Sequence, residues 1–179
     1  MPAYVCMLRG INVGGKNKVG MKALGALFQA LGHADVATYI QSGNVVFRSS
    51  KTDTSVLGEA IEQRILGELG STVQVVLRED HELNAVPERN PFAGSGRDPA
   101  RLHVTFLKAM PDPDLVTALD GYQSPPDEFA IDGREVYLHC PDGYGNTKLN
   151  NTFFERRLKT VATTRNWNTV AKLAEMAAS

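Results

Sequence analysis

The chain has 179 residues, 42% hydrophobic and 22% charged, which is typical of a globular protein with one large or two small domains. Its net charge of −1 argues against sequence-independent binding of nucleic acid. No apolar run approaches the roughly 18 residues of a membrane span, and the N-terminus has neither the basic segment nor the cleavage site of a signal peptide. We therefore expect a cytoplasmic protein without a membrane partner.

The first half alternates strand-like and helical patterns. Six elements are expected: strands at 3–9, 35–40, 45–48 and 73–78, and helices over about 21–31 and 54–69. Gly32 and Gly70 would end the two helices, and Asp53 or Thr54 would cap the second. The order βαββαβ is that of a ferredoxin-like module, in which two helices cover one face of a four-stranded antiparallel sheet.

A stretch rich in Pro, Gly and charge over 87–101 predicts a connecting loop between modules at 1–86 and 102–179. The second module is expected to start with a strand at 102–108 and a short helix opened by Asp112 and Pro113. A hairpin over 129–139 would turn at Asp132 and Gly133. Helices over about 147–158 and 165–177 complete a βαββα-type module that ends in a helix rather than a strand. The fold class is therefore α+β.

The segment RGINVGGKN at 9–17 approaches a phosphate-binding P-loop, because Gly10 and Lys16 lie in a G-x-x-x-x-G-K pattern. It lacks the Ser or Thr that would contact magnesium, since Asn17 stands there. The following helix starts only near Met21, and the expected sheet is antiparallel, whereas P-loops occur in parallel sheets. We therefore expect no nucleotide hydrolysis. A basic loop that binds an anion through its amides, or a merely solvated one, both remain open.

Charge is distributed unevenly along the chain. Residues 1–34 carry four basic residues and no acid, and residues 143–179 carry six basic residues and two acids, whereas 35–142 holds eighteen acids and nine bases. If the two ends meet in space, they would form a positive surface that attracts an anion.

Enzyme and metal signatures are sparse. The four histidines are scattered without ligand spacing, no G-x-S-x-G motif occurs, and neither cysteine lies beside a plausible His base. Cys6 and Cys140 are expected to be buried, reduced thiols. The sequence predicts no metal and no cofactor, and it leaves open whether the protein is an enzyme.

Several segments resemble the DUF1697 family, a bacterial family of unknown function. They are YVCMLRGINVGGKNKVGM, TYIQSGNVVF, NPF at 90–92, RLHVTFL, and TKLNN followed by FFERRLKTVATTRNWNTVAKL. The resemblance implies an α+β fold with ferredoxin-like parts and implies no activity. Its polar signature groups lie at 9–15, 41–44 and 163–168.

We expect these groups to form a cleft between the two modules for a small anionic ligand, such as a nucleotide or a phosphorylated metabolite. The expected ligand-binding residues are Arg9, Asn12, Gly14, Gly15, Lys16, Gln41, Ser42, Asn44, Arg165 and Asn166. The alternatives are a turn role for 41–44, a helix-capping role for Thr164 or Asn166, and pairing of Arg165 with an acid. At the level of the whole protein, the alternatives are an interaction module, monomeric or homodimeric through an open sheet edge, and an RNA-binding protein.

Overall fold

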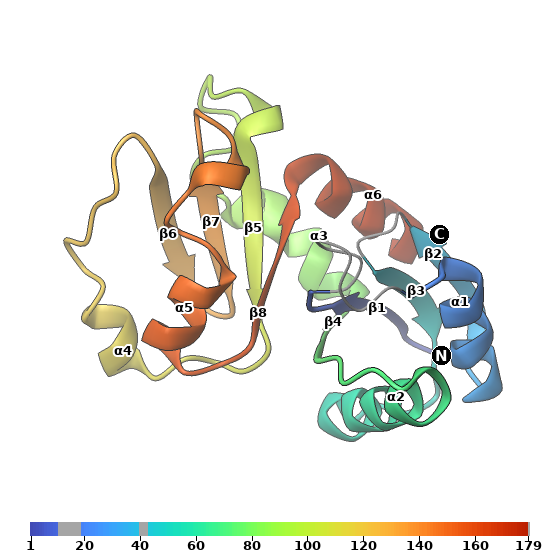
Figure 1. The fold of residues 1–179 in the computed structure, drawn as a ribbon. Helices are drawn as coiled ribbons and strands as arrows, with labels where there is room; N and C mark the ends of the chain where they lie inside the picture. Colours follow the sequence, from blue (N-terminus) through green and yellow to red (C-terminus); the bar gives the residue numbers. More distant parts are fainter. Residues whose placement is uncertain (11–18, 40–42, 179) are drawn as a thin grey trace. The chain divides into compact units, whose positions relative to one another are not determined.

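The computed structural model describes residues 1–10, 19–39 and 43–178 (Figure 1). The chain divides into two compact units. The first comprises Met1–Asn84 together with Leu173–Ser179, and the second comprises Ala85–Lys172. The division therefore falls inside two helices, α3 (Asp80–Arg89), shortly before the segment 87–101, and α6 (Trp167–Ala178).

The first unit is a ferredoxin-like module, as the element order predicts. Its elements are β1 (Ala3–Leu8), α1 (Met21–Ala30), β2 (Ala34–Tyr39), β3 (Asn44–Arg48), α2 (Thr54–Leu69) and β4 (Val75–Glu79). The four strands form an antiparallel sheet in the order β2-β3-β1-β4. The central strands are therefore β1 and β3.

Helices α1 and α2 lie on one face of this sheet (Figure 1), and a single core fills the space between them. Because strand side chains alternate between faces, Tyr4 and Cys6 of β1 both point into that core. The predicted caps of α2 are confirmed: the Asp53 carboxylate accepts the backbone N–H groups of Ser55 and Val56, and Gly70 has φ 69°.

The second unit repeats the same topology. Its elements are β5 (Leu102–Leu107), α4 (Pro113–Thr117), β6 (Glu128–Asp132), β7 (Glu135–His139), α5 (Asn151–Leu158) and β8 (Ala162–Asn166), and α6 (Trp167–Ala178) follows. The antiparallel order is β6-β7-β5-β8, in which the central strands are again the first and third of the unit. The α+β class with two modules is thus confirmed.

The expectation that the second module ends without a strand is wrong. Strand β8 pairs along β5, with Val104 opposite Arg165 and Leu107 opposite Ala162. Its sequence, ATTRN, is polar and lacks the alternation that marks a half-buried strand, so only the long-range pairing with β5 defines it.

Two boundaries in the second unit also differ from the prediction. Helix α5 begins at Asn151 rather than near 147, because the Asn150 side chain caps it by accepting the N–H of Phe153. The hairpin between β6 and β7 is confirmed, but its two loop residues are Gly133 and Arg134, one residue later than expected. Gly133 has φ 63°, and glycine at the first loop position is typical of a type II′ turn.

Candidate functional site

Two glycine-containing turns leave the first sheet at the same end. Gly10 follows β1 with φ 70° and Gly43 precedes β3 with φ 82°, backbone conformations that favour glycine. The two segments are adjacent, because the Leu8 N–H donates to the Gly43 carbonyl at 2.8 Å. Half-buried Arg9 lies directly beside this junction, and its N–H donates to the Gln74 carbonyl of the segment before β4 at 2.9 Å.

Asn44 has a structural role at this end of the sheet. It is fully buried, and its Nδ2 donates to the Tyr39 carbonyl at 3.0 Å, which links the end of β2 to the start of β3. The other expected ligand residues of the first unit lie outside the described residues: Asn12, Gly14, Gly15, Lys16, Gln41 and Ser42.

Arg165 and Asn166 belong to the second unit and differ in their surroundings. Arg165 is 6% exposed in β8, where its Nη1 donates to Thr163 Oγ1 at 2.7 Å and to the Thr164 carbonyl at 3.0 Å. Asn166 is exposed and caps α6, because its Oδ1 accepts the N–H of Thr169 at 2.8 Å. Capping by Asn166 is thus confirmed, whereas Thr164 lies within the strand.

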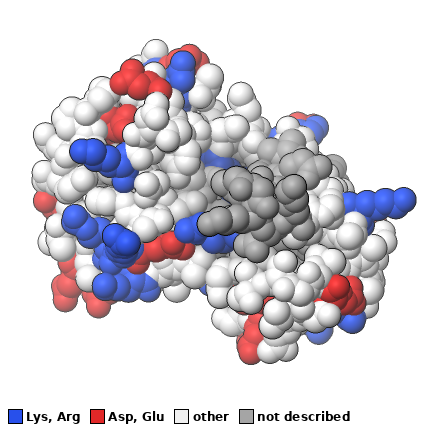
Figure 2. Space-filling view, in the orientation of Figure 1, with Lys and Arg blue, Asp and Glu red and all other residues white. Residues whose placement is uncertain are grey.

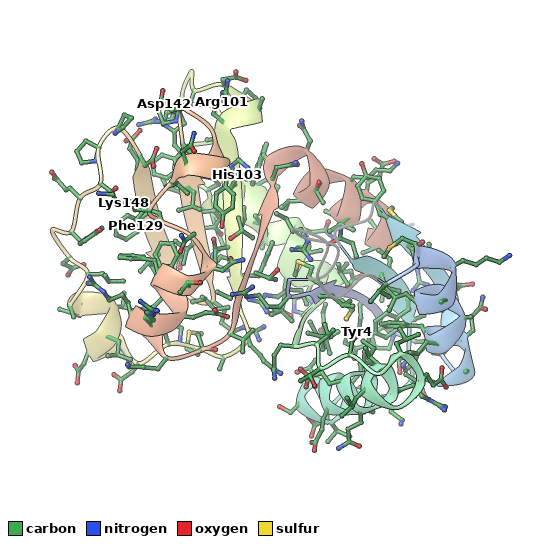
Figure 3. The ribbon with its side chains drawn as sticks, in the orientation of Figure 1. Tyr4, Arg101, His103, Phe129, Asp142 and Lys148 are labelled. Atoms are coloured by element: carbon green, nitrogen blue, oxygen red, sulfur yellow. The ribbon has the colours of Figure 1, made fainter. Side chains whose placement is uncertain are left out.

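A hydrogen-bonded cluster between β5, β8 and the segment before α5 was not predicted. Thr164 Oγ1 lies 2.7 Å from Thr105 Oγ1, donates to Asn151 Oδ1 at 2.6 Å and accepts from the Tyr144 hydroxyl at 3.1 Å. The His103 ring, seen in Figure 3, stacks on Tyr144 with centroids 4.9 Å apart. These residues are far apart in the sequence, and only the glycines flanking Tyr144 marked this segment as a turn.

His103 is the least satisfied member of this cluster. Among the described residues its Nδ1 has no hydrogen-bond partner, although the atom is buried. Burial lowers the pKa of His103, and a backbone hydrogen bond with Arg101 opposes that effect. The imidazole is therefore neutral at neutral pH.

The opposite face of the second sheet carries a charged network. Arg97 holds both carboxylate oxygens of Glu128 at 3.0 and 2.9 Å, and His139 Nδ1 lies 2.9 Å from the same carboxylate. Arg89 bonds Asp132 at 2.8 Å and the nearly buried Glu135 at 3.3 Å. The hydrogen bond from Arg97 lowers the pKa of Glu128, and that from Arg89 lowers the pKa of Asp132.

On the second unit, Lys and Arg side chains gather over α5 and the segment before it, with acidic side chains beside them and by α4 (Figure 2). The basic residues of this region include Lys148, Arg156 and Arg157, and the guanidinium of Arg157 lies over the rings of Phe153 and Tyr122. This cation–π stacking holds the Arg157 guanidinium against aromatic rings of its own unit.

Both cysteines are free and buried, as predicted. Burial, together with the Asp127 charge, raises the pKa of Cys140 to about 11, and a hydrogen bond from Thr147 only partly opposes this. A thiol with so high a pKa is a poor nucleophile at neutral pH.

Residues 1–10, 19–39 and 43–178 contain neither a metal-binding cluster nor a membrane-spanning helix. No group of three or more His, Cys, Asp or Glu side chains there is arranged to hold a metal ion. None of the helices in these same ranges combines the length and the apolar character needed to cross a membrane.

Comparison with known proteins identifies a family and a similar solved structure. The family model described as "Protein of unknown function (DUF1697)" matches residues 1–137. A solved structure, the conserved bacterial protein SP0830 from Streptococcus pneumoniae, is similar to this chain with a TM-score of 0.74 and 26% sequence identity, over 98% of each chain. No curated protein matches. These findings confirm the family resemblance and the two-module α+β fold.

Proposed function

Since the chain belongs to the DUF1697 family, which brings no activity with it, we propose from its own geometry that it binds a small anionic ligand at the end of the first sheet, beside Arg9. The observation that carries the proposal is the position of Arg9. It follows a central strand, and it lies where the turns at Gly10 and Gly43 leave the sheet side by side.

The local charge supports an anion over a cation at this end. Residues 1–34 contain four basic residues and no acid, and three of the four, Lys16, Lys18 and Lys22, follow within the next residues of the chain. A half-buried guanidinium can donate two parallel hydrogen bonds to a phosphate or carboxylate, and these are stronger than neutral ones. The ligand class is therefore a phosphorylated or carboxylated small molecule.

Of the other expected ligand residues that the structure describes, three already have structural partners. The Asn44 amide links the end of β2 to the start of β3, the Arg165 guanidinium bonds within β8, and the Asn166 side chain caps a helix. The proposal depends on Arg9 and on the basic segment that follows it because of their charge and their position at the end of the first sheet.

An RNA-binding role receives less support. RNA-recognition modules stack bases on exposed aromatic side chains of their central strands. The aromatic residues at those strands of the first unit are Tyr4 and Phe47, which are fully buried and stack on each other at 5.6 Å in the core. Neither ring is available to a base.

The test is a thermal-shift titration with inorganic pyrophosphate, followed by a panel of nucleotides and sugar phosphates. We expect the wild type to be stabilised with a saturable dose response, and Arg9→Ala to lose most of that stabilisation. The matched control is Arg64→Ala, an arginine of α2 that has 39% of its side chain exposed and pairs with Glu68. An equal response in both variants would refute the proposal.

A second variant separates ligand binding from a purely structural role of Arg9. The Glu62 carboxylate reaches the same end of the sheet, where its Oε2 accepts the Val75 N–H at 3.0 Å. Removing a negative charge near an anion site strengthens binding, so Glu62→Gln should lower the apparent Kd of pyrophosphate. If Glu62→Gln changes only the unfolding temperature of the ligand-free protein, the anion proposal fails.

A further inference from the structure

The second unit contains a pocket of about 500 Å³ beside strand β6. One wall is β6 itself and the other is the connection from α4, residues 116–127, which Figure 1 shows curving away from the strand. The volume lies within the range of pockets that bind ligands, about 300–1,000 Å³. The proposed anion site lies in the other unit, so this pocket is a separate feature.

The pocket follows the open edge of the sheet. In the order β6-β7-β5-β8, strand β6 is terminal, and no described strand pairs with its outer side. Four consecutive residues of β6, from Glu128 to Ile131, line the pocket. Since neighbouring side chains of a strand point to opposite faces, contact with four in succession places the pocket along the backbone edge. Alternate N–H and C=O groups of that edge are directed outward.

Two aromatic side chains, Tyr122 and Phe129, line the pocket. The rings of Tyr122 and Phe129 lie 6.4 Å apart at 56°, and each is braced by α5, Tyr122 on Phe153 at 5.0 Å and Phe129 on Phe154 at 5.7 Å. These contacts hold the two rings in a fixed arrangement. Figure 3 labels Phe129 beside the connection that forms the second wall.

All three charged side chains that line the pocket are carboxylates: Asp120, Asp127 and Glu128. Arg97 offsets the charge of Glu128, and His139 Nδ1 lies 2.9 Å from the same carboxylate. Asp127 instead accepts a hydrogen bond from the Thr147 hydroxyl at 2.6 Å. Because this hydroxyl is neutral, it does not offset the negative charge of Asp127. The Arg157 guanidinium already lies over the Tyr122 ring, so the carboxylates and the Phe129 ring are the groups that favour a cationic side chain, through ion pairing and cation–π attraction.

We propose that this pocket is a docking site for a short extended segment of another protein, with Lys or Arg at alternate positions, which adds as a strand to β6. Strand addition to an open edge obtains affinity from main-chain hydrogen bonds and specificity from pockets for alternate side chains. Here the specificity would come from Phe129 together with Asp120 and Asp127. The segment that fits along four residues of β6 is about four to six residues long.

The test uses an acetylated and amidated peptide of alternating Val and Lys, about six residues long, and follows the amide NMR signals of the protein. We expect the largest shifts at Phe129, Ala130 and Ile131. A peptide of identical sequence with N-methylated backbone keeps the charge but cannot form the strand hydrogen bonds, so it should bind about fivefold more weakly for each hydrogen bond lost. Equal affinity of the two peptides, or of spermidine at the same residues, would overturn strand addition.

The charge requirement is tested with Asp120→Asn and Asp127→Asn, each of which keeps an acceptor oxygen. Each should weaken the lysine peptide about two- to fivefold, whereas Asp114→Asn on α4, which does not line the pocket, should have no effect. Asp120 is exposed, so its variant is expected to fold normally. A peptide of alternating Val and Glu that binds as tightly as the lysine peptide would refute a cationic partner.

Discussion

Thr105 of β5 and Thr164 of β8 face each other, and their side-chain oxygens lie 2.7 Å apart in a hydrogen bond. Thr105 is fully buried. The Thr164 hydroxyl also bonds Asn151 and Tyr144, so it links the edge strand to α5 and to the segment before it. One hydroxyl thus connects three parts of the second unit.

Replacing this hydroxyl should destabilise the second unit. Thr164→Val keeps the shape of the side chain but leaves the buried Thr105 hydroxyl without this partner, and we expect a loss of about 2 kcal/mol in the free energy of unfolding. Urea denaturation measures this loss. The exposed Thr152 of α5 is the control, since Thr152→Val should change stability by less than about 0.5 kcal/mol. Equal effects in the two variants would contradict a role for the hydroxyl cluster.

The cap of α6 gives a second prediction. Asn166→Ala removes the acceptor for the Thr169 N–H and should cost about 1 kcal/mol in stability. Asn166→Asp keeps the acceptor and adds a negative charge at the helix N-terminus, so it should be neutral or stabilising. The exposed Asn168 in the first turn serves as the comparison in urea denaturation. If Asn168→Ala is as costly as Asn166→Ala, the cap does not account for the loss.

A third prediction concerns Arg89. Arg89→Met removes the ion partner at 3.3 Å from the Glu135 side chain, which is only 6% exposed, and the bonds to Asp132. Because the Arg89 side chain is itself 37% exposed, we expect a cost of about 1–2 kcal/mol, below that of a fully buried pair. Arg89→Lys should retain part of the stability that Arg89→Met loses. The lysine ammonium keeps the positive charge, but it lacks the planar guanidinium that bonds two carboxylate oxygens at once.

The cost of Arg89→Met should depend on pH. Arg89 lowers the pKa of Asp132, so the stabilisation is present above the unfolded pKa of about 3.9 and is lost as the pH falls through the folded value. Unfolding free energies measured near pH 7 and near pH 3 should therefore show a smaller difference between wild type and variant at low pH. A difference that grows on acidification would contradict the ion pair.

Thiol accessibility is the fourth prediction. With Cys6 fully buried and the pKa of Cys140 raised to about 11, the native protein should react with Ellman's reagent at pH 8 far more slowly than free cysteine. In guanidinium chloride both thiols should react. Rapid reaction of one thiol in the native protein would contradict the buried environment.

Two histidines should make the folded protein less stable in acid. Burial lowers the pKa of His33 and of His103 below the ordinary value of 6.5. The unfolded chain then binds more protons than the folded one below pH 6.5, so stability should fall as the pH drops from there toward the folded pKa. His103→Gln should lose less stability than wild type between pH 7.5 and 5.5. His81, with 71% of its side chain exposed, is the control, and an equal response of His81→Gln would refute this assignment.

Local sequence signals determined most of the fold. The helical spacing of Leu24, Leu27 and Phe28, the cap at Asp53 and the positive-φ glycine at Gly70 act within one or two turns of chain, so composition and spacing reveal them. These signals are sufficient to predict the βαββαβ order of the first module and the α+β class of the fold.

The tertiary structure decided what depends on distant partners. The segment ATTRN at 162–166 forms β8 because it pairs with β5 through backbone hydrogen bonds. The same pairing places Thr164 opposite Thr105 within the sheet, so Thr164 is not the cap of α6. The cluster of His103, Tyr144 and Thr164 unites residues that no local pattern connects. Short-range preferences are encoded in neighbouring residues, whereas strand partners are fixed only when long-range contacts repay the entropy of closing the chain.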